Sequence, residues 1–172
     1  MSKVDLSVKI GSLRLRNPIM LASGTVGYGN EISEFSNLNQ LGAIVTKSLS
    51  LKPRKGNPPQ RIVETPAGML NAIGLANVGV DEFLKEKIPF LKKYDVPLIC
   101  NIAASTVEEY VECTRILDSE ETIKAFEINV SCPNVKDGGL QFGNDKNAVG
   151  NVTAKVRAVT NKPLIIKLSP NV

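Results

Sequence analysis

The sequence predicts an α/β fold of the (β/α)8, TIM-type barrel class, of which this chain holds an N-terminal hairpin and about five of the eight strands. Short apolar segments alternate with amphipathic segments, as expected for a parallel sheet with helices between its strands. Polar side chains follow the carboxyl ends of these strands, which in a barrel share one rim where active sites lie. No GxGxxG turn or P-loop follows a strand, which disfavours a nucleotide-binding fold of either kind.

The chain is expected to begin with a β-hairpin. Residues 4–16 alternate apolar and polar on both sides of Gly11. The apolar positions of the first half are expected on one face: Val4, Leu6, Val8 and Ile10. Residues 18–22 form a continuous apolar run, typical of a strand buried on both faces. The glycine-rich loop 23–29 that follows is able to approach a ligand closely.

The next part of the chain combines short elements with a long irregular segment. A short helix is expected at 31–38 and a strand at 43–45. Residues 49–80 contain four prolines and show no clear periodicity, so we expect a functional loop rather than a simple connection. Its last part, residues 71–77, carries two amides in an apolar, glycine-containing setting, as a loop that binds a polar ligand would.

The remaining chain alternates helices and strands. Asp81 is expected to cap a helix that runs to Tyr94 and is kinked at Pro89. Ser105 and Glu108 form a capping box for the next helix. The apolar faces of these two helices are expected to consist of Phe83, Leu84, Ile88 and Leu91, and of Val107, Tyr110, Val111 and Leu117. The last helix is marked by Val149, Val152, Val156 and Val159, and the strands are expected at 96–102, 125–130 and 163–168.

The strand count bears on the extent of the domain. Five strands leave a barrel open, with unpaired backbone groups at its edge. We therefore expect residues 1–172 to be the N-terminal portion of a single barrel domain, with the missing strands in a longer polypeptide or supplied from elsewhere.

Composition narrows the class of protein. The apolar fraction of 42% and the charged fraction of 22% are typical of soluble globular proteins, and nothing resembles a signal peptide or membrane span, so a cytoplasmic location is expected. Three cysteines without metal-ligand spacing and the absence of histidine argue against a metal site. The net charge of +4 is mild, and the basic residues Lys52, Arg54 and Lys55 have no interleaved aromatics, so nucleic-acid binding is disfavoured.

Candidate functional side chains gather where the predicted strands end. They are Ser23, Lys47, Asn101, Asn129 with Cys132, and Lys167. Cys132 lies between a strand end and a proline, followed by a glycine-rich loop, which suits a rigidly presented thiol under a movable cover. A free cysteine is more often a small buried packing residue, and the residues around Cys132 alone leave both readings open.

The motifs taken together resemble the dihydroorotate dehydrogenase family, and in particular its class 1B catalytic subunits. The matching segments are NPIMLASGTVGYG (17–29), GAIVTKS (42–48), NAIGLANVG (71–79), ICNIAAS (99–105), EINVSCPN (127–134) and LIIKLSPNV (164–172). The resemblance implies an FMN-containing barrel that oxidises dihydroorotate to orotate in pyrimidine (UMP) biosynthesis. It also implies that the last three strands, which supply most of the FMN phosphate site, are missing here.

The resemblance also assigns roles to individual residues. FMN contacts are implied for Ser23, Lys47, Ser48, Asn101, Asn129 and Lys167. Substrate contacts are implied for Lys47, Asn71, Ala72, Ile73, Gly74, Leu75 and Asn129. Cys132 would be the base that takes the C5 proton. A serine base marks the membrane-linked class 2 of the family, so Cys132 indicates class 1. Class 1B implies an iron–sulfur flavoprotein subunit with FAD and a [2Fe-2S] cluster that passes electrons to NAD⁺, and a homodimer of catalytic subunits within a heterotetramer.

Other interpretations remain. One alternative is another flavin barrel that acts on reduced pyrimidines. A tRNA dihydrouridine synthase of this kind should show a strongly basic face for RNA, which this sequence lacks. A dihydropyrimidine dehydrogenase-like enzyme handles neutral bases, which gives no reason for Lys47 at the substrate. A non-catalytic half-barrel used for binding or assembly is a third possibility, and the colour of the purified protein separates it from a flavoprotein.

Overall fold

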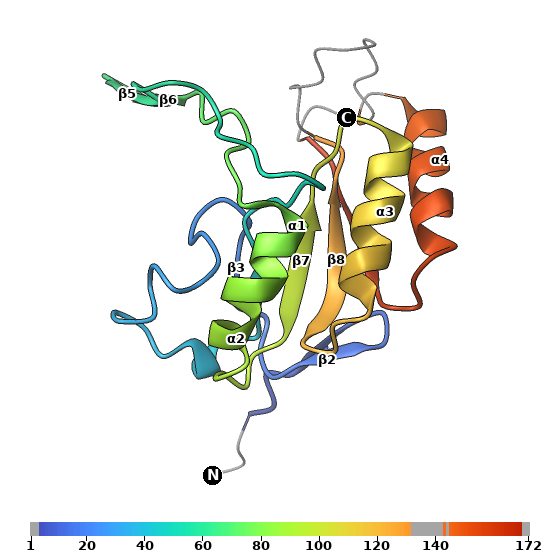
Figure 1. Ribbon diagram of the computed structural model, residues 1–172. Coiled ribbons are helices and arrows are strands. Elements are labelled where there is room, and N and C mark those ends of the chain that lie inside the picture. The colour runs from blue at the N-terminus through green and yellow to red at the C-terminus, as the bar shows by residue number, and fades with distance from the viewer. Residues whose placement is uncertain (1–3, 132–142, 144, 170–172) are drawn as a thin grey trace.

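A curled parallel sheet forms the centre of the computed structural model, which describes residues 4–131, 143 and 145–169 (Figure 1). Its five strands lie in the order β3-β4-β7-β8-β9, and each neighbouring pair is parallel. They are β3 (Met20–Leu21), β4 (Ala43–Val45), β7 (Leu98–Ile102), β8 (Ile123–Asn129) and β9 (Leu164–Lys167). The sheet curls as half of a barrel does, which is consistent with the predicted partial barrel of about five strands.

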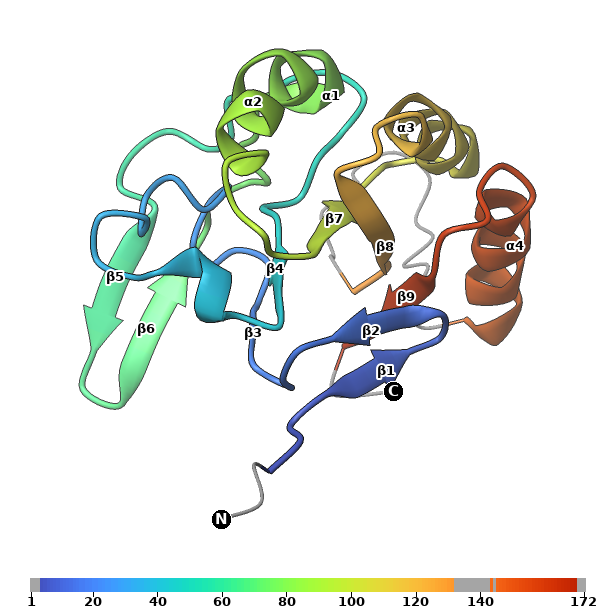
Figure 2. The same cartoon turned by 90° about the horizontal axis from the view of Figure 1, so that it is seen from below.

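Helices cover the convex side of this sheet (Figure 2). They are α1 (Gly79–Glu82), the π-helical segment η2 (Phe83–Lys87), α2 (Ile88–Leu91), α3 (Val107–Asp118) and α4 (Lys146–Arg157). Their inward residues pack against alternate residues of the strands, including Phe126 and Ile128 of β8. The predicted apolar faces of the helices are confirmed, since Phe83, Ile88, Tyr110 and Leu117 are all buried in this core and Val152 and Val156 join them from α4.

The opposite, concave side of the sheet has a smaller apolar core. The hairpin of β1 (Val8–Ile10) and β2 (Leu13–Leu15) lies below it, as Figure 2 shows. Leu15 of the hairpin is buried against residues from three sheet strands: Ala43, Val45, Ile99 and Ala125. The hairpin therefore covers the amino end of the concave side with apolar side chains, and we call this cluster of Leu15, Ala43, Val45, Ile99 and Ala125 the apolar plug. The polar side chains further along the same strands lie beyond the apolar plug.

Two expectations for the N-terminal region are wrong. The hairpin strand begins only at Val8, and Val4 and Leu6 precede it as exposed side chains. The run 18–22 was expected to be buried on both faces, but β3 has two residues and Met20 is 39% exposed. β3 is one of the two edge strands of the described sheet and pairs only with β4 there, so part of its surface is left uncovered.

The helix expected at 31–38 is replaced by turns and a short 3-10 helix, η1 (Leu38–Gln40). Backbone hydrogen bonds link Phe35 to Ile32 and Ser36 to Ile32, but no regular helix follows within this segment. Serine and asparagine side chains compete with the backbone and favour turns and caps. Asn37 does so here, because its side chain accepts a hydrogen bond from the Asn39 backbone and caps η1.

The helix boundaries after residue 78 also differ from expectation. The first helix begins at Gly79 with Val78 at its N-cap, so Asp81 lies in the first turn and is not the cap. The distortion expected at Pro89 takes the form of the π-helical segment η2, which ends at Lys87 and places Pro89 in the first turn of α2, where its missing N–H is tolerated. The next helix is capped by Thr106, whose side chain accepts from Glu109 N, one residue later than expected.

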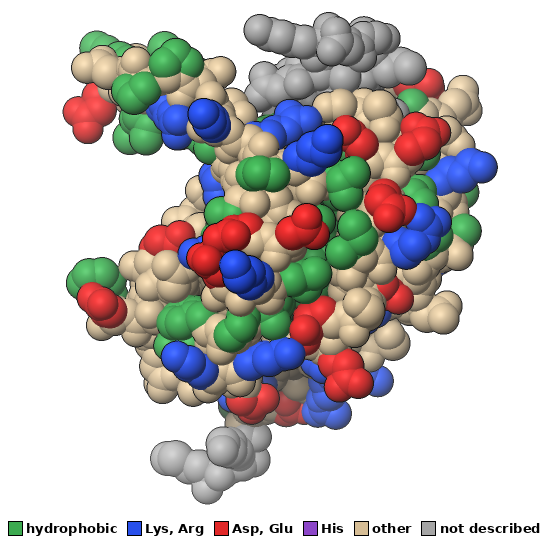
Figure 3. Space-filling model, viewed as in Figure 1, with side chains coloured by type: hydrophobic (Ala, Val, Ile, Leu, Met, Phe, Trp, Pro, Cys, Tyr) green, Lys and Arg blue, Asp and Glu red, His purple; other side chains and the backbone are tan. Residues whose placement is uncertain are grey.

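A second hairpin lies in the segment that was expected to be an irregular loop. Strands β5 (Ile62–Thr65) and β6 (Gly68–Asn71) pair with each other and project from the body as an arm (Figure 1). Figure 3 shows apolar side chains gathered on this arm, and Ile62, Val63, Met69 and Leu70 are more than half exposed. The sequence failed to indicate this pair because neither strand buries a face, so no alternation marks it.

Candidate active site

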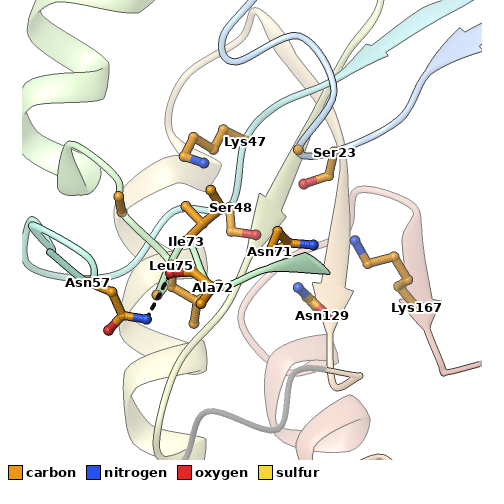
Figure 4. Close-up of a pocket in the computed structure, with 13 residues that line it drawn as sticks. Ser23, Lys47, Ser48, Asn57, Asn71, Ala72, Ile73, Leu75, Asn129 and Lys167 are labelled. Atoms are coloured by element: carbon orange, nitrogen blue, oxygen red, sulfur yellow. Dashed lines mark hydrogen bonds between the residues drawn. The ribbon is translucent and has the colours of Figure 1, made fainter. Parts of the chain in front are cut away.

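The cavity at the carboxyl ends of the strands has a volume of about 490 Å³ (Figure 4). It is lined by Ser23, Gly24, Lys47, Ser48, Asn57, Asn71, Ala72, Ile73, Gly74, Leu75, Ala76, Asn129 and Lys167. This volume lies in the range of small-molecule and cofactor sites. Strand ends and the segment 71–76 therefore build one site, from residues that are up to 144 positions apart (23 to 167).

Lys47 and Ser48 enter the cavity because β4 ends at Val45, shortly before them. β4 is fully buried, and its last register pair, Val45 with Ile99, holds it against β7. The Lys47 backbone N–H then donates to the carbonyl of Gly27 at 2.8 Å, which ties the β4 end to the glycine-rich loop. The two loops are thus fixed to each other, and the Lys47 side chain stands between them and the segment 71–76 (Figure 4).

The segment 71–76 has an unusual backbone. Gly74 has φ of +73° and Leu75 has φ of +54°, and a positive φ is uncommon for a residue with a side chain. A Cβ at Gly74 would lie 2.7 Å from the backbone nitrogen of Asn57, so only glycine fits there. Asn57 Nδ2 also donates to Ala72 O at 2.9 Å. Backbone strain of this kind clusters at ligand sites, and here it lies in the cavity wall.

Asn129 is held from two sides. The buried hydroxyl of Tyr110 on α3 donates to the Asn129 carbonyl at 2.7 Å. The Asn129 side-chain oxygen accepts from Ser131 Oγ at 2.7 Å, so its amide nitrogen is left on the side of Asn71 (Figure 4). An amide whose oxygen is already bonded presents donors, and Asn129 therefore offers N–H groups to an acceptor in the cavity.

Replacing Tyr110 by phenylalanine is expected to lower the free energy of unfolding of the complete chain by about 1–3 kcal/mol, because a buried carbonyl loses its donor. Tyr94→Phe is the control, because no described residue bonds the Tyr94 hydroxyl, while its ring packs against Phe90 and the edge of the core. Urea unfolding of both variants provides the measurement. Equal losses in the two variants would show that the Tyr110 hydrogen bond contributes nothing specific.

A polar cluster lies beside the cavity on the concave face. Asn101 and Glu127 are register partners on β7 and β8, and Asn129 and Lys167 are register partners on β8 and β9. Asn101 Nδ2 donates to Glu127 Oε1 at 2.5 Å, and Lys167 Nζ lies 3.4 Å from the same oxygen. Asn101 is fully buried, and its Oδ1 has no hydrogen-bond partner among the described residues.

The described cysteines are packing residues. Burial raises the pKa of the fully buried Cys100 thiol well above its usual range and raises the pKa of Cys113 to about 12. Both thiols therefore stay protonated at neutral pH, as expected for a strand residue and a helix residue of the core. Within the described part of the chain, no group of three or more His, Cys, Asp or Glu residues is arranged to hold a metal ion.

Comparison with known proteins identifies the family of this chain over nearly its whole length. The family model described as dihydroorotate dehydrogenase matches residues 5–172. The chain belongs to the dihydroorotate dehydrogenase family. Curated relatives from Geotalea daltonii and Geobacter sulfurreducens are 58% and 57% identical over all of this chain, and one from Thermoanaerobacter is 52% identical over 98% of it. All three are named dihydroorotate dehydrogenase B (NAD(+)), catalytic subunit, and the match covers 56% of the length of each.

The structure brings most residues suggested by the family resemblance into one place. The cavity is lined by Ser23, Lys47, Ser48, Asn71, Ala72, Ile73, Gly74, Leu75, Asn129 and Lys167. Asn101 differs, since it is buried next to Glu127 and does not line the cavity. Cys132 lies outside the described residues. In the described part of the chain, no helix is long and apolar enough to span a membrane.

Sequence reasoning missed Asn57 and Glu127. Asn57 lies in a segment rich in proline, glycine and lysine, where no pattern distinguishes it from a surface amide. Glu127 carried a usable signal, because an acid in the middle of the apolar strand AFEINV shares a face with Asn129 at a spacing of two. A side chain that shares the face of a candidate site residue is itself a candidate, even inside an apolar strand.

Proposed function

We propose that the complete protein is an FMN-dependent dihydroorotate dehydrogenase of class 1B, which oxidises dihydroorotate to orotate in UMP biosynthesis. Residues 1–172 would then be the N-terminal part of a single (β/α)8 barrel domain whose later strands close the sheet. One observation carries the proposal: the cavity at the strand ends combines two lysines with side-chain amides. The relatives of this chain named dihydroorotate dehydrogenase B (NAD(+)), catalytic subunit, agree with it.

The charges of the cavity suit an anionic substrate. Lys47 and Lys167 line it, and none of its described lining residues is acidic. Orotate carries a carboxylate and a ring of imide groups, which need a cation and both donors and acceptors. Lys47 would hold the carboxylate, and Asn71, the backbone of residues 72–75 and Asn129 would bond the ring. A neutral pyrimidine would leave the Lys47 ammonium without its counterion in the cavity.

The polar cluster beside the cavity fits a flavin. Asn101 has a buried side-chain carbonyl oxygen with no donor among the described residues, and such an atom is costly unless a ligand N–H reaches it. Ser23, Lys47, Ser48, Asn101, Asn129 and Lys167 would hold FMN, and the isoalloxazine ring offers both N–H and carbonyl groups to them. When bound, FMN would supply the acceptor for the hydride from C6 of dihydroorotate.

The residues of this chain would perform the remaining steps. Lys47 and the segment 71–75 orient the substrate so that C6 faces the flavin and C5 faces the base. The thiolate of Cys132 would take the C5 proton, and an unperturbed cysteine pKa of about 8.5 makes this feasible if its surroundings favour the thiolate. Lys167 would stabilise the negative charge that develops near flavin N1 and O2.

Electrons would leave through a second protein. Class 1B membership implies an iron–sulfur flavoprotein subunit that carries FAD and a [2Fe-2S] cluster and reduces NAD⁺. We propose that two catalytic chains pair and that each binds one such subunit, as a heterotetramer in the cytoplasm. The relatives named as catalytic subunits of an NAD(+) enzyme support the existence of a separate electron-transfer subunit.

Anaerobic mixing of the complete chain with dihydroorotate tests the proposal. The isolated chain should bind one FMN, its flavin should bleach, and orotate should form. It should reduce artificial acceptors but not NAD⁺ until the iron–sulfur flavoprotein is added. A colourless protein, or flavin that dihydroorotate leaves oxidised, would overturn the activity, whereas efficient use of NAD⁺ or fumarate by the isolated chain would overturn the class 1B assignment alone.

A further inference from the structure

Glu127 is the acid of the polar cluster on the concave face. Its side chain is 13% exposed although it lies in the middle of β8. It points to the same side as Ala125 and Asn129, since alternate residues of a strand share a face. Ala125 belongs to the apolar plug above the hairpin, and Asn129 lines the cavity. The carboxylate therefore lies between the apolar plug and the cavity.

One carboxylate oxygen takes two contacts from the flanking strands. Asn101 Nδ2 on β7 lies 2.5 Å from Glu127 Oε1, and Lys167 Nζ on β9 lies 3.4 Å from it. An ionised carboxylate only accepts hydrogen bonds, so the Asn101 amide must direct its NH₂ group toward Glu127. The Asn101 carbonyl oxygen is then turned away from Glu127, which explains why it is buried without a described partner.

The same contact fixes the lysine at the cavity wall. Lys167 lines the cavity while its ammonium remains within ion-pair distance of Glu127. A lysine side chain has several rotatable bonds, and a charged partner at its end restricts them. The carboxylate also offsets part of the lysine charge, so it reduces the stabilisation that Lys167 offers to an anion in the cavity.

We propose that Glu127 is a positioning residue of the flavin site: through one oxygen it orients the Asn101 amide as an acceptor for a ligand N–H and holds the Lys167 ammonium at the cavity. This inference rests on the proposed function. It assigns two effects to Glu127 that can be measured separately. Orientation of Asn101 determines how tightly FMN binds, and the charge beside Lys167 determines the reduction potential of the bound flavin.

Two substitutions in the complete chain separate these effects. Glu127→Gln keeps an oxygen that accepts from Asn101 but removes the charge, so FMN affinity should stay within about threefold of wild type. The equilibrium constant for flavin reduction should rise about tenfold, which corresponds to about 30 mV for a two-electron couple. Glu127→Ala removes the acceptor as well, and its dissociation constant for FMN should rise about tenfold. Potentials are measured with saturating FMN, so weaker retention does not hide the change.

A double-mutant cycle and a matched control complete the test. If Glu127 acts through Asn101, Glu127→Ala should cost little further FMN affinity in an Asn101→Ala background. Glu121→Gln removes the same charge at an exposed position before β8 and should change neither quantity. A wild-type potential in Glu127→Gln, or full additivity in the cycle, would overturn the inference while the proposed function stands. A wild-type chain that binds no FMN would overturn both.

Discussion

Replacing Cys132 by serine in the complete enzyme is expected to slow reduction of its flavin by dihydroorotate about 10²–10⁴-fold at neutral pH, which corresponds to about 3–5 kcal/mol. Serine keeps the size and a polar hydrogen, but its hydroxyl has a much higher pKa than a thiol, so little alkoxide is present. The rate should recover partly as pH rises, because the deprotonated fraction grows. FMN content and orotate affinity should remain near wild type, because the thiol is not proposed as a binding group. Anaerobic stopped-flow measurement of flavin bleaching across a pH series provides the rates.

Cys113→Ser is the matched control for this experiment. Cys113 is a buried residue of α3, and burial raises its pKa to about 12, so it has no thiolate to lose at neutral pH. This variant should keep the wild-type pH profile, even if a buried hydroxyl lowers its stability. If Cys132→Ser reduces its flavin at the wild-type rate at neutral pH, Cys132 is not the base.

Replacing Phe126 by alanine is expected to lower the free energy of unfolding of the complete chain by about 3–5 kcal/mol. Phe126 is fully buried in the middle of β8, where the helices pack on the convex side of the sheet. Its ring also lies 5.8 Å from the ammonium of Lys162. Burial lowers the pKa of Lys162, and the nearby carboxylate of Asp118 offsets part of this decrease. Truncation would leave a cavity and remove this contact, in the strand that carries Glu127 and Asn129. Urea unfolding without added flavin measures the loss, because bound ligand would stabilise both proteins.

Phe35→Ala makes the same change at the surface. The Phe35 side chain is 84% exposed in the turns after β3, so its removal should alter the free energy of unfolding by less than about 0.5 kcal/mol. Losses of similar size in the two variants would contradict the assignment of Phe126 to the core.

Buried, periodic segments are the part of the fold that could be predicted from the sequence alone. β4 has the expected bounds, and β7, β8 and β9 lie within about two residues of theirs. α4 carries Val149, Val152 and Val156 on its inner side as expected, but it ends at Arg157, before Val159. Each of these elements has a continuous apolar run or a helical apolar stripe, because burial demands one. The same rule explains the failures. The arm of β5 and β6 buries no face, β3 is exposed at the sheet edge, and residues 31–37 form turns that are largely exposed.

Part of the candidate site could likewise be predicted from the sequence, and part depends on the tertiary structure. The sequence by itself determined which residues stand at strand ends, since Lys47, Asn129 and Lys167 follow or end apolar strands, and parallel strands bring such ends together. Only the tertiary structure decided that Asn101 lies beside the cavity wall, and that Glu127 joins it to Lys167 across three strands. The physical reason is that strand register and sheet curvature set which side chains meet. Both depend on contacts between segments 26 to 40 residues apart (101 to 127, 127 to 167), which no local pattern encodes.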